Sequence, residues 1–214
     1  RRYRSGRARR WDVAAAPDGT LYVADTWNHR VQHFNGDGAY MNGWGVEGNT
    51  EGKATGDPGV FFGPRGIAAD QEGRVLVSDT GNKRVQIFDS AGAFVSQFGG
   101  SGLQPGQLDE PVGIDTDALG NIAVADTWNG RVQTFNAEGL PIASWEIDGW
   151  LEKEKVGKPY VAMDRRGNVY VADQAGLRIL VFNRGGTYLG SFGQYSNGSD
   201  NRGFGLPSGI AVDQ

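Results

Sequence analysis

The sequence predicts an all-β chain whose short antiparallel strands repeat along its length. The segment VADTWNHRVQHF at residues 23–34 recurs as VSDTGNKRVQIF at 77–88, VADTWNGRVQTF at 124–135 and VADQAGLRILVF at 171–182. The repeated aspartates, Asp25, Asp79, Asp126 and Asp173, are 54, 47 and 47 residues apart. No stretch has the pattern of a capped amphipathic helix, although residues 149–157 (GWLEKEKVG) could hold one helical turn. Repeats of about 40 to 50 residues with four strands each are typical of β-propeller blades.

The four strands of a repeat follow from its apolar runs and turns. In the second repeat, GIAAD (66–70) is a short apolar run that the turn QEG closes. RVLVSD (74–79) and RVQIF (84–88) flank the turn TGNK, and AFVSQFG (93–99) follows the turn DSAG. We expect a basic arm or linker at 1–10, blades at about 11–61, 62–107, 108–157 and 158–203, and the first strand of a fifth blade, GIAVD, within 204–214.

The residues that carry the period resemble the NHL repeat, a propeller repeat with an Asn-His-Leu-type signature in its hairpin. The matching pairs are Asn28-His29, Asn82-Lys83 and Asn129-Gly130, while the fourth copy has Gly176-Leu177 and, two residues earlier, Gln174 in place of Thr. The resemblance implies a ring that usually has six blades, which at this period needs roughly 280 residues. The sequence therefore predicts an incomplete ring, which further residues or a second copy would complete, because an open arc exposes strand edges and apolar faces.

An arginine follows each repeated Asp by five residues. These arginines are Arg30, Arg84, Arg131 and Arg178. We interpret the pairs as structural, because opposite charges at the two ends of a hairpin loop stabilise it, and a catalytic group has no reason to recur in every blade. The phenylalanines nine residues after each Asp are expected in the core by the same reasoning. We expect partly exposed Asp–Arg pairs whose removal costs about 1 kcal/mol or less.

Positions that differ between copies are better candidates for binding. The hairpin position after Thr holds Trp27, Gly81, Trp128 and Ala175 in the four repeats. Two exposed tryptophans on one rim can stack on sugars, bases or Pro-rich peptides, whereas the structural alternative is that each covers the neighbouring blade. We add His29, Arg65 and Trp150 to the rim candidates; Trp150 lies among charges in one of two long connections, 46–60 and 147–158.

Catalytic, metal and cofactor sites are not predicted. His29 and His33 are the only histidines and share one hairpin, so their side chains need not converge on a metal ion. We expect a non-catalytic binding or scaffolding propeller, the sensor, adhesion or interaction part of a larger, extracytoplasmic bacterial protein, which engages a protein, peptide or glycan. The alternative is a lyase-like or lactonase-like enzyme with its metal ligands in the missing blades, because related six-bladed propellers include metal-dependent lyases and lactonases with His and carboxylate ligands around the channel.

The charge distribution limits the partners. Residues 1–10 hold six Arg and no acid, while the remainder has 15 basic and 25 acidic residues. The arm is interpreted as a solvated linker, with phosphate or anionic lipid contact as the alternative. RNA binding, known for some animal NHL propellers, is disfavoured by the acidic body, because phosphate contacts dominate nucleic-acid affinity. The chain has no cysteine and no apolar run of about 18 residues, so neither a thiolate site nor a membrane span is expected.

Overall fold

The computed structural model describes residues 12–53, 55–150, 159–195 and 203–213. Their main strands form four antiparallel sheets of four strands each. Blade 1 contains β1 (Asp12–Ala15), β2 (Leu21–Asp25), β3 (Arg30–Phe34) and β4 (Tyr40–Trp44). Blade 2 contains β7 (Gly66–Ala69), β8 (Val75–Asp79), β9 (Arg84–Phe88) and β10 (Phe94–Gly99). Blade 3 contains β11 (Pro111–Thr116), β12 (Ile122–Asp126), β13 (Arg131–Phe135) and β14 (Pro141–Glu146). Blade 4 contains β15 (Val161–Met163), β16 (Val169–Asp173), β17 (Arg178–Phe182) and β18 (Tyr188–Phe192).

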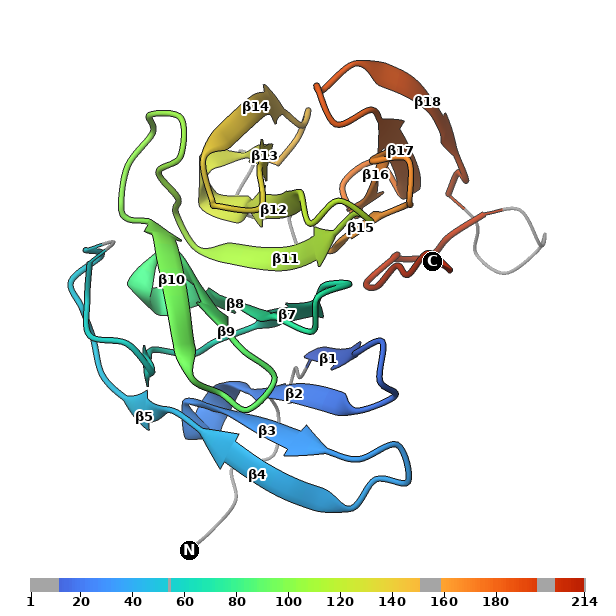
Figure 1. Cartoon of the computed structure of the whole chain (residues 1–214). Helices are drawn as coiled ribbons and strands as arrows, with labels where there is room; N and C mark the ends of the chain where they lie inside the picture. Colours follow the sequence, from blue (N-terminus) through green and yellow to red (C-terminus); the bar gives the residue numbers. More distant parts are fainter. Residues whose placement is uncertain (1–11, 54, 151–158, 196–202, 214) are drawn as a thin grey trace, which may run out of the picture.

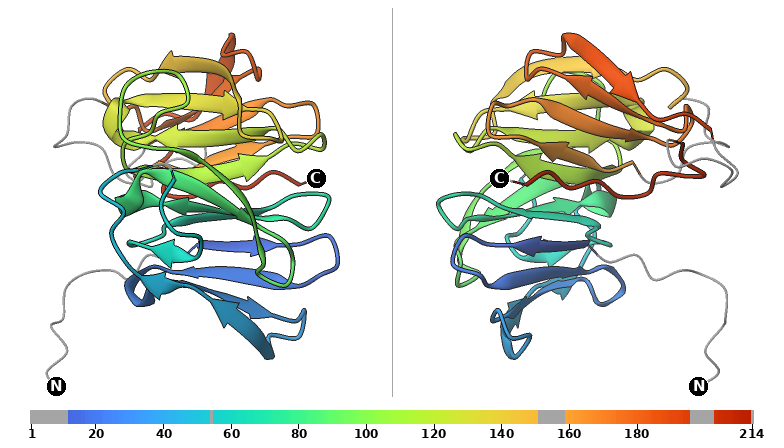
Figure 2. Two further views of the ribbon diagram at one scale, coloured as in Figure 1. Left: turned by 60° about the vertical axis from the view of Figure 1, so that its left-hand side comes forward. Right: turned by 90° about the vertical axis from the view of Figure 1, so that its right-hand side faces the viewer.

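The four sheets fan around a common centre. The first strands of the blades lie innermost: β7 contacts β1 and β11, and β11 contacts β15 (Figure 1). The predicted β-propeller architecture of four-stranded antiparallel blades is confirmed. The sheets stack face to face when the molecule is viewed from the side (Figure 2). Because each sheet is an antiparallel meander, the hairpin between its second and third strands lies at the same end as the connection that enters it. We call this end of the blades the connection face.

The hydrophobic core lies between neighbouring blades. One cluster joins Tyr22 and Val31 of blade 1 to Val77 and Phe88 of blade 2, and all four side chains are almost completely buried. Similar clusters fill the spaces between blades 2 and 3 and between blades 3 and 4. Strands packed on both faces carry apolar residues on both, which explains why the sequence does not alternate cleanly between polar and apolar positions.

Turn chemistry fixes the hairpins at the opposite end of the blades. Asp70 follows the first strand of blade 2, and its Oδ1 accepts the backbone N–H groups of Glu72 and Arg74. Asp117 and Asp164 accept the equivalent pairs of N–H groups in blades 3 and 4. This Asp–turn arrangement recurs in blades 2, 3 and 4, and its hydrogen bonds fix the hairpin between the first and second strands of each.

Two features differ from the expected strands. Val46–Glu47 (β5) and Val60–Phe61 (β6) form a short parallel ribbon inside the connection between blades 1 and 2. Residues 209–213 form no strand pairing with the described residues and run beside the inner strands (Figure 1), so a fifth blade that begins there stays a prediction. The basic arm 1–10 and most of 149–157 lie outside the described residues. Among the described residues, no helix is long and apolar enough to cross a membrane.

Candidate functional site

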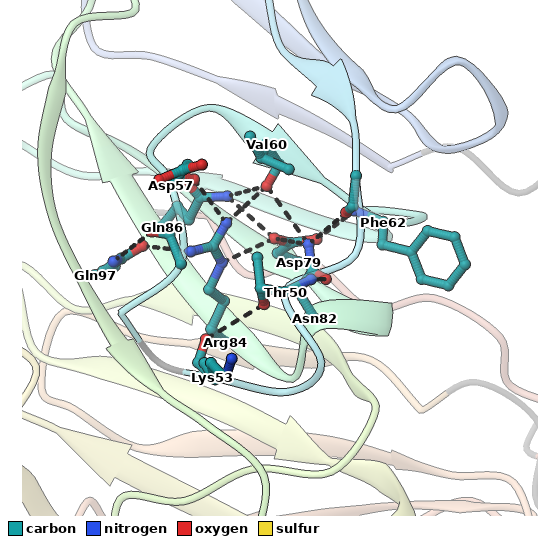
Figure 3. Close-up of polar contacts among 12 residues, drawn as sticks. Thr50, Lys53, Asp57, Val60, Phe62, Asp79, Asn82, Arg84, Gln86 and Gln97 are labelled. Carbon is teal, nitrogen blue, oxygen red and sulfur yellow. Dashed lines mark hydrogen bonds and ion pairs between the residues drawn. The ribbon is translucent and has the colours of Figure 1, made fainter.

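The repeated Asp is the centre of a polar cluster within each hairpin. In blade 2, Asp79 Oδ2 accepts hydrogen bonds from Asn82 Nδ2 at 2.9 Å, Arg84 Nε at 3.0 Å and Gln86 Nε2 at 3.1 Å (Figure 3). The short 3-10 helices Thr26–Asn28 (η1), Thr80–Asn82 (η2) and Thr127–Asn129 (η3) turn the Asn side chain back onto the Asp. We call the Asp, Asn, Arg and Gln of one hairpin its clamp.

The clamp recurs with small changes. Blade 1 has Asp25, Asn28, Arg30 and Gln32, and blade 3 has Asp126, Asn129, Arg131 and Gln133, with the same donors directed at the Asp. In blade 4, Asp173 keeps its 3.0 Å bond from Arg178, but Leu180 stands in place of Gln. The N–H of Gly176 replaces the missing Asn amide.

The clamp of blade 2 holds the backbone of the connection that leads into that blade. Phe62 N–H donates to Asp79 Oδ1 at 2.8 Å, and Phe62 C=O accepts the N–H of Gly81. The carbonyl two residues earlier, at Val60, accepts hydrogen bonds from Arg84 and Gln86. The N–H three residues earlier, at Gly59, donates to Gln86, and the carbonyl five residues earlier, at Asp57, accepts from Arg84 (Figure 3).

Blade 3 repeats this arrangement at the same offsets. Asp109 N–H donates to Asp126, and Asp109 C=O accepts the N–H of Trp128. Gln107, Gly106 and Gln104 stand two, three and five residues earlier, and they make the same backbone contacts with Arg131 and Gln133. The repeated charged residues therefore bind main chain, which explains why the two connections differ in sequence.

The expected exposure of the Asp–Arg pairs is wrong where a described connection covers them. The Arg84 and Asp79 side chains are both 0% exposed, and Arg131 is nearly buried, because the connections lie over their guanidinium groups. Arg30 and Arg178 remain 44% and 40% exposed, although their Asp partners are buried. Burial raises the pKa of the Asp79 and Asp126 carboxyl groups, and the hydrogen bonds from their clamps oppose this shift.

The rim candidates separate into exposed and buried residues. Trp27 and Trp128 lie on equivalent hairpins of the connection face and are 57% and 50% exposed. The position between them in sequence is Gly81, where a Cβ atom would overlap the ring and the carbonyl oxygen of Phe62. A side chain is therefore excluded at this hairpin by the connection that covers it. Trp150 is only 2% exposed and packs in the core between blades 3 and 4, so its proposed place on the rim is wrong.

His29 and Arg65 make local contacts on the connection face. His29 Nδ1 accepts the N–H of Gly63 at 3.0 Å, its ring stacks on Phe62, and its Nε2 lies 3.8 Å from Glu47 Oε1. Arg65 and Glu110, which precede the inner strands of neighbouring blades, form an ion pair at 3.6 Å. These contacts hold both side chains on the connection face.

The histidines do not converge on a common site. His33 is buried, stacks on Tyr22 at 4.3 Å, and lies with Nδ1 3.0 Å from Asn42 Oδ1. Since the Asn42 amide nitrogen donates to the Ala91 carbonyl, its Oδ1 is the acceptor and His33 Nδ1 carries the proton. Within the described ranges, no three or more His, Asp or Glu residues form a group that could hold a metal ion.

Two carboxylates on the inner strands were not found from the sequence. Asp12 Oδ2 accepts the N–H of Ile67 at 3.0 Å, and Asp115 Oδ2 accepts the N–H of Met163 at 2.7 Å, so each carboxylate joins two blades. Both line a central cavity of about 670 Å³. Burial raises the pKa of each to about 6. The equivalent positions of blade 2 hold Gly66 and Ala68. Neither carboxylate therefore belongs to a residue pattern that repeats along the sequence.

The comparison with protein families agrees with the repeated hairpins. The family model described as the NHL repeat matches residues 11–34, 61–88 and 108–135. The chain contains NHL repeats. These three NHL matches cover the first three strands of blades 1, 2 and 3, including their clamps.

Curated relatives of this NHL chain match short parts of long animal proteins. Protein lin-41 of Caenorhabditis elegans is 50% identical over 48 residues, which is 22% of this chain and 4% of the relative. RING finger protein nhl-1 of Caenorhabditis elegans is 43% identical over 68 residues, 27% of this chain and 7% of the relative. Protein brain tumor of Drosophila melanogaster is 43% identical over 49 residues, which is 23% of this chain and 5% of the relative. The expected bacterial origin therefore gains no support from these relatives.

Solved structures share the propeller fold at low sequence identity. A streptogramin B lyase has a TM-score of 0.64 at 13% identity, over 87% of this chain and 55% of the lyase. Virginiamycin B lyase from Staphylococcus aureus has a TM-score of 0.63 at 12% identity, over 88% of this chain and 56% of the lyase. A chain of a nidogen/laminin complex has a TM-score of 0.56 at 19% identity, over 83% of this chain and 65% of the matched chain. The NHL chain thus spans about half the length of the lyases, and identity this low shows the fold alone.

Proposed function

We propose that the chain is a non-catalytic binding module that engages a protein, peptide or glycan through its connection face. The observation that carries this proposal is the pair of tryptophans, Trp27 and Trp128, which leave half or more of their surface in water. A tryptophan that served only to cover its neighbouring blade would be buried, as Trp150 is. Exposed aromatic side chains of this size are common energetic centres of binding sites.

The surroundings of the two tryptophans fit a protein, peptide or glycan better than a nucleic acid. Phe62 and Leu103 add exposed apolar surface on the same face, at 40% and 70% exposure. The nearby charges are paired, since Lys83 lies 3.0 Å from Asp109 and Arg65 pairs with Glu110. A face with apolar centres and neutralised charges offers stacking and apolar contact, whereas phosphate binding needs unpaired cations.

The lyase alternative has less support. The likeness to streptogramin B lyase is one of fold, at 13% identity, and a shared fold does not imply a shared activity. His29 and His33 are each hydrogen-bonded within blade 1 or to its connection. The binding proposal therefore accounts for a feature, the exposed tryptophans, that the lyase alternative does not use.

Selection from a displayed peptide library and from a glycan array tests the proposal. The chain, the Trp27→Ala/Trp128→Ala variant, and a Leu119→Ala/Leu140→Ala control would be compared. The control removes exposed apolar side chains from the opposite end of blade 3. We expect ligands that bind the chain and the control and that lose at least about ten-fold in affinity with the tryptophan variant. Failure to select any ligand, or ligands that bind all three proteins equally, would refute the proposal.

A further inference from the structure

Each of the two exposed tryptophans is followed by an acidic residue at the same distance along the chain. Glu47 stands twenty residues after Trp27, and Asp148 stands twenty residues after Trp128. The equivalent places of the other two blades have neither residue type: they hold Gly81 with Ser101 and Ala175 with Tyr195. Tryptophan and carboxylate therefore occur together in blades 1 and 3 and are both replaced in blades 2 and 4.

Strand register shows that the two acids occupy equivalent points of the fold. In blade 1, Val31 of β3 lies opposite Trp44 of β4, and in blade 3, Val132 of β13 lies opposite Trp145 of β14. In both blades the acid stands three residues after the outer-strand partner, and the exposed tryptophan stands four residues before the other partner. Because the strands are antiparallel, both positions lie at the end of the blade that forms the connection face.

The two carboxylates keep their charge on this face. The Glu47 side chain is 70% exposed, and its Oε1 lies 3.8 Å from Nε2 of His29. Because His29 Nδ1 accepts the N–H of Gly63, the ring carries its proton on Nε2 and is neutral. Asp148 is also exposed. Within the described ranges, neither acid forms an ion pair with a lysine or arginine.

The charge around the tryptophans therefore favours a cationic partner. Lys83 and Arg65, which lie on the same face, are already paired with the acids Asp109 and Glu110. Beyond residue 10 the chain has 15 basic and 25 acidic residues, so its overall field is negative as well. Complementary charge steers association and selects partners of the opposite sign.

An exposed indole and a carboxylate from the same end of a blade suit a lysine or arginine side chain. Tryptophan attracts a cation over its ring face more strongly than the other aromatic residues do. A carboxylate accepts charge-assisted hydrogen bonds from the same cation. In the hairpin of Trp27, the rings of His29 and Phe62 stack with their centroids 5.7 Å apart and add aromatic surface. A neutral sugar could stack on the indole, but it would bring no cation to the carboxylate.

We propose that the connection face binds a segment of a partner protein through two basic side chains, one at Trp27 and Glu47 and one at Trp128 and Asp148. At each place the lysine or arginine stacks on the indole and donates hydrogen bonds to the carboxylate. This inference rests on the proposed function, since it uses the same tryptophans, and it narrows the ligand to a basic protein segment. Two such places on one rigid scaffold bind a segment with two basic residues more tightly than either place binds one.

Fluorescence anisotropy with labelled arginine peptides tests the proposal on the full chain. Each peptide carries a pair of arginines separated by about one to eight Gly or Ser residues, so that the series samples a range of distances. We expect saturable binding for part of the series. The carboxamide variant, Glu47→Gln/Asp148→Asn, and the tryptophan variant, Trp27→Ala/Trp128→Ala, should each weaken this binding by at least about ten-fold. Peptides with neutral citrulline in place of arginine should not bind.

The matched control is Asp37→Asn/Glu138→Gln. It removes the same two charges from the same two blades, but from exposed residues in the turns that precede the outer strands, at the opposite end from the connection face. This control should leave peptide binding unchanged. An equal loss in the control and in the carboxamide variant would trace the binding to overall charge and overturn the proposal.

The outcomes also separate this inference from the proposed function. Ligands from the library selection that lose affinity with the tryptophan variant, but bind the carboxamide variant as they bind the chain, would overturn the basic-segment inference and leave the proposed function in place. Absence of saturable binding across the arginine series would overturn the inference as well. Tighter binding of a glucosamine oligomer than of any arginine peptide would assign the face to a cationic glycan instead.

Discussion

Replacing Arg84 or Arg178 with methionine separates burial from the ion pair itself. Both arginines donate from Nε to Oδ2 of their Asp at 3.0 Å, so the two pairs have the same geometry. They differ in surroundings, because the Arg84 side chain is 0% exposed and that of Arg178 is 40% exposed. Arg84 also donates to Gln97 Oε1 and to the carbonyls of Asp57 and Val60.

The expected losses of stability differ several-fold. Arg84→Met leaves the buried Asp79 carboxylate without its cation and leaves the two connection carbonyls with fewer donors. Removing one partner of a buried pair costs about 3–5 kcal/mol of unfolding free energy. Arg178→Met removes an ion pair that water already screens. Loss of such a pair lowers the unfolding free energy by about 1 kcal/mol or less.

Urea unfolding followed by tryptophan fluorescence measures both variants. The change in midpoint, multiplied by the slope of the wild-type transition, gives the difference in unfolding free energy. Far-ultraviolet circular dichroism before unfolding checks that each variant keeps its β-sheet content. Equal losses in the two variants, or a loss for Arg84→Met of about 1 kcal/mol or less, would show that the clamp is not held by buried main-chain contacts.

Three further outcomes are expected. Asp12 and Asp115 have a pKa of about 6 in the fold against an ordinary value of 3.8, so the folded state binds protons more tightly and stability falls as pH rises from about 4 to 6. The Asp12→Asn/Asp115→Asn variant should lose this pH dependence when urea unfolding is measured at a series of pH values. An unchanged dependence of the unfolding free energy on pH would contradict the burial of these two carboxyl groups at the central cavity. Trp150→Ala should lower the unfolding free energy by about 3–5 kcal/mol, since it empties a core site, and a loss under about 1 kcal/mol would place the ring outside the core. Gly81→Ala should displace Phe62 and increase hydrogen exchange at the Phe62 amide, whereas unchanged protection would show that the hairpin tolerates a side chain there.

The sequence by itself determined the blades. The recurrence of Asp25, Asp79 and Asp126 within the same hairpin pattern follows from a repeated four-stranded unit, and strand and turn signals are local properties of the chain. The same periodicity indicated that the Asp–Arg pairs are structural, and the clamps are consistent with that interpretation. Local signals could also place Trp27 and Trp128 on equivalent hairpins, because the hairpin pattern surrounds each of them.

Only the tertiary structure decided burial and the partners of each side chain. Trp150 is bounded by charges in sequence, yet the space between two blades encloses it. Arg84 is fully buried and Arg30 is half exposed, although both follow an Asp at the same spacing, because a described connection covers one and not the other. Asp12 and Asp115 lie at unrelated positions of their repeats and share a cavity only because the inner strands surround one centre. These properties depend on contacts between residues far apart in the chain, and a repeat pattern carries no information about such contacts when it is the same in every copy.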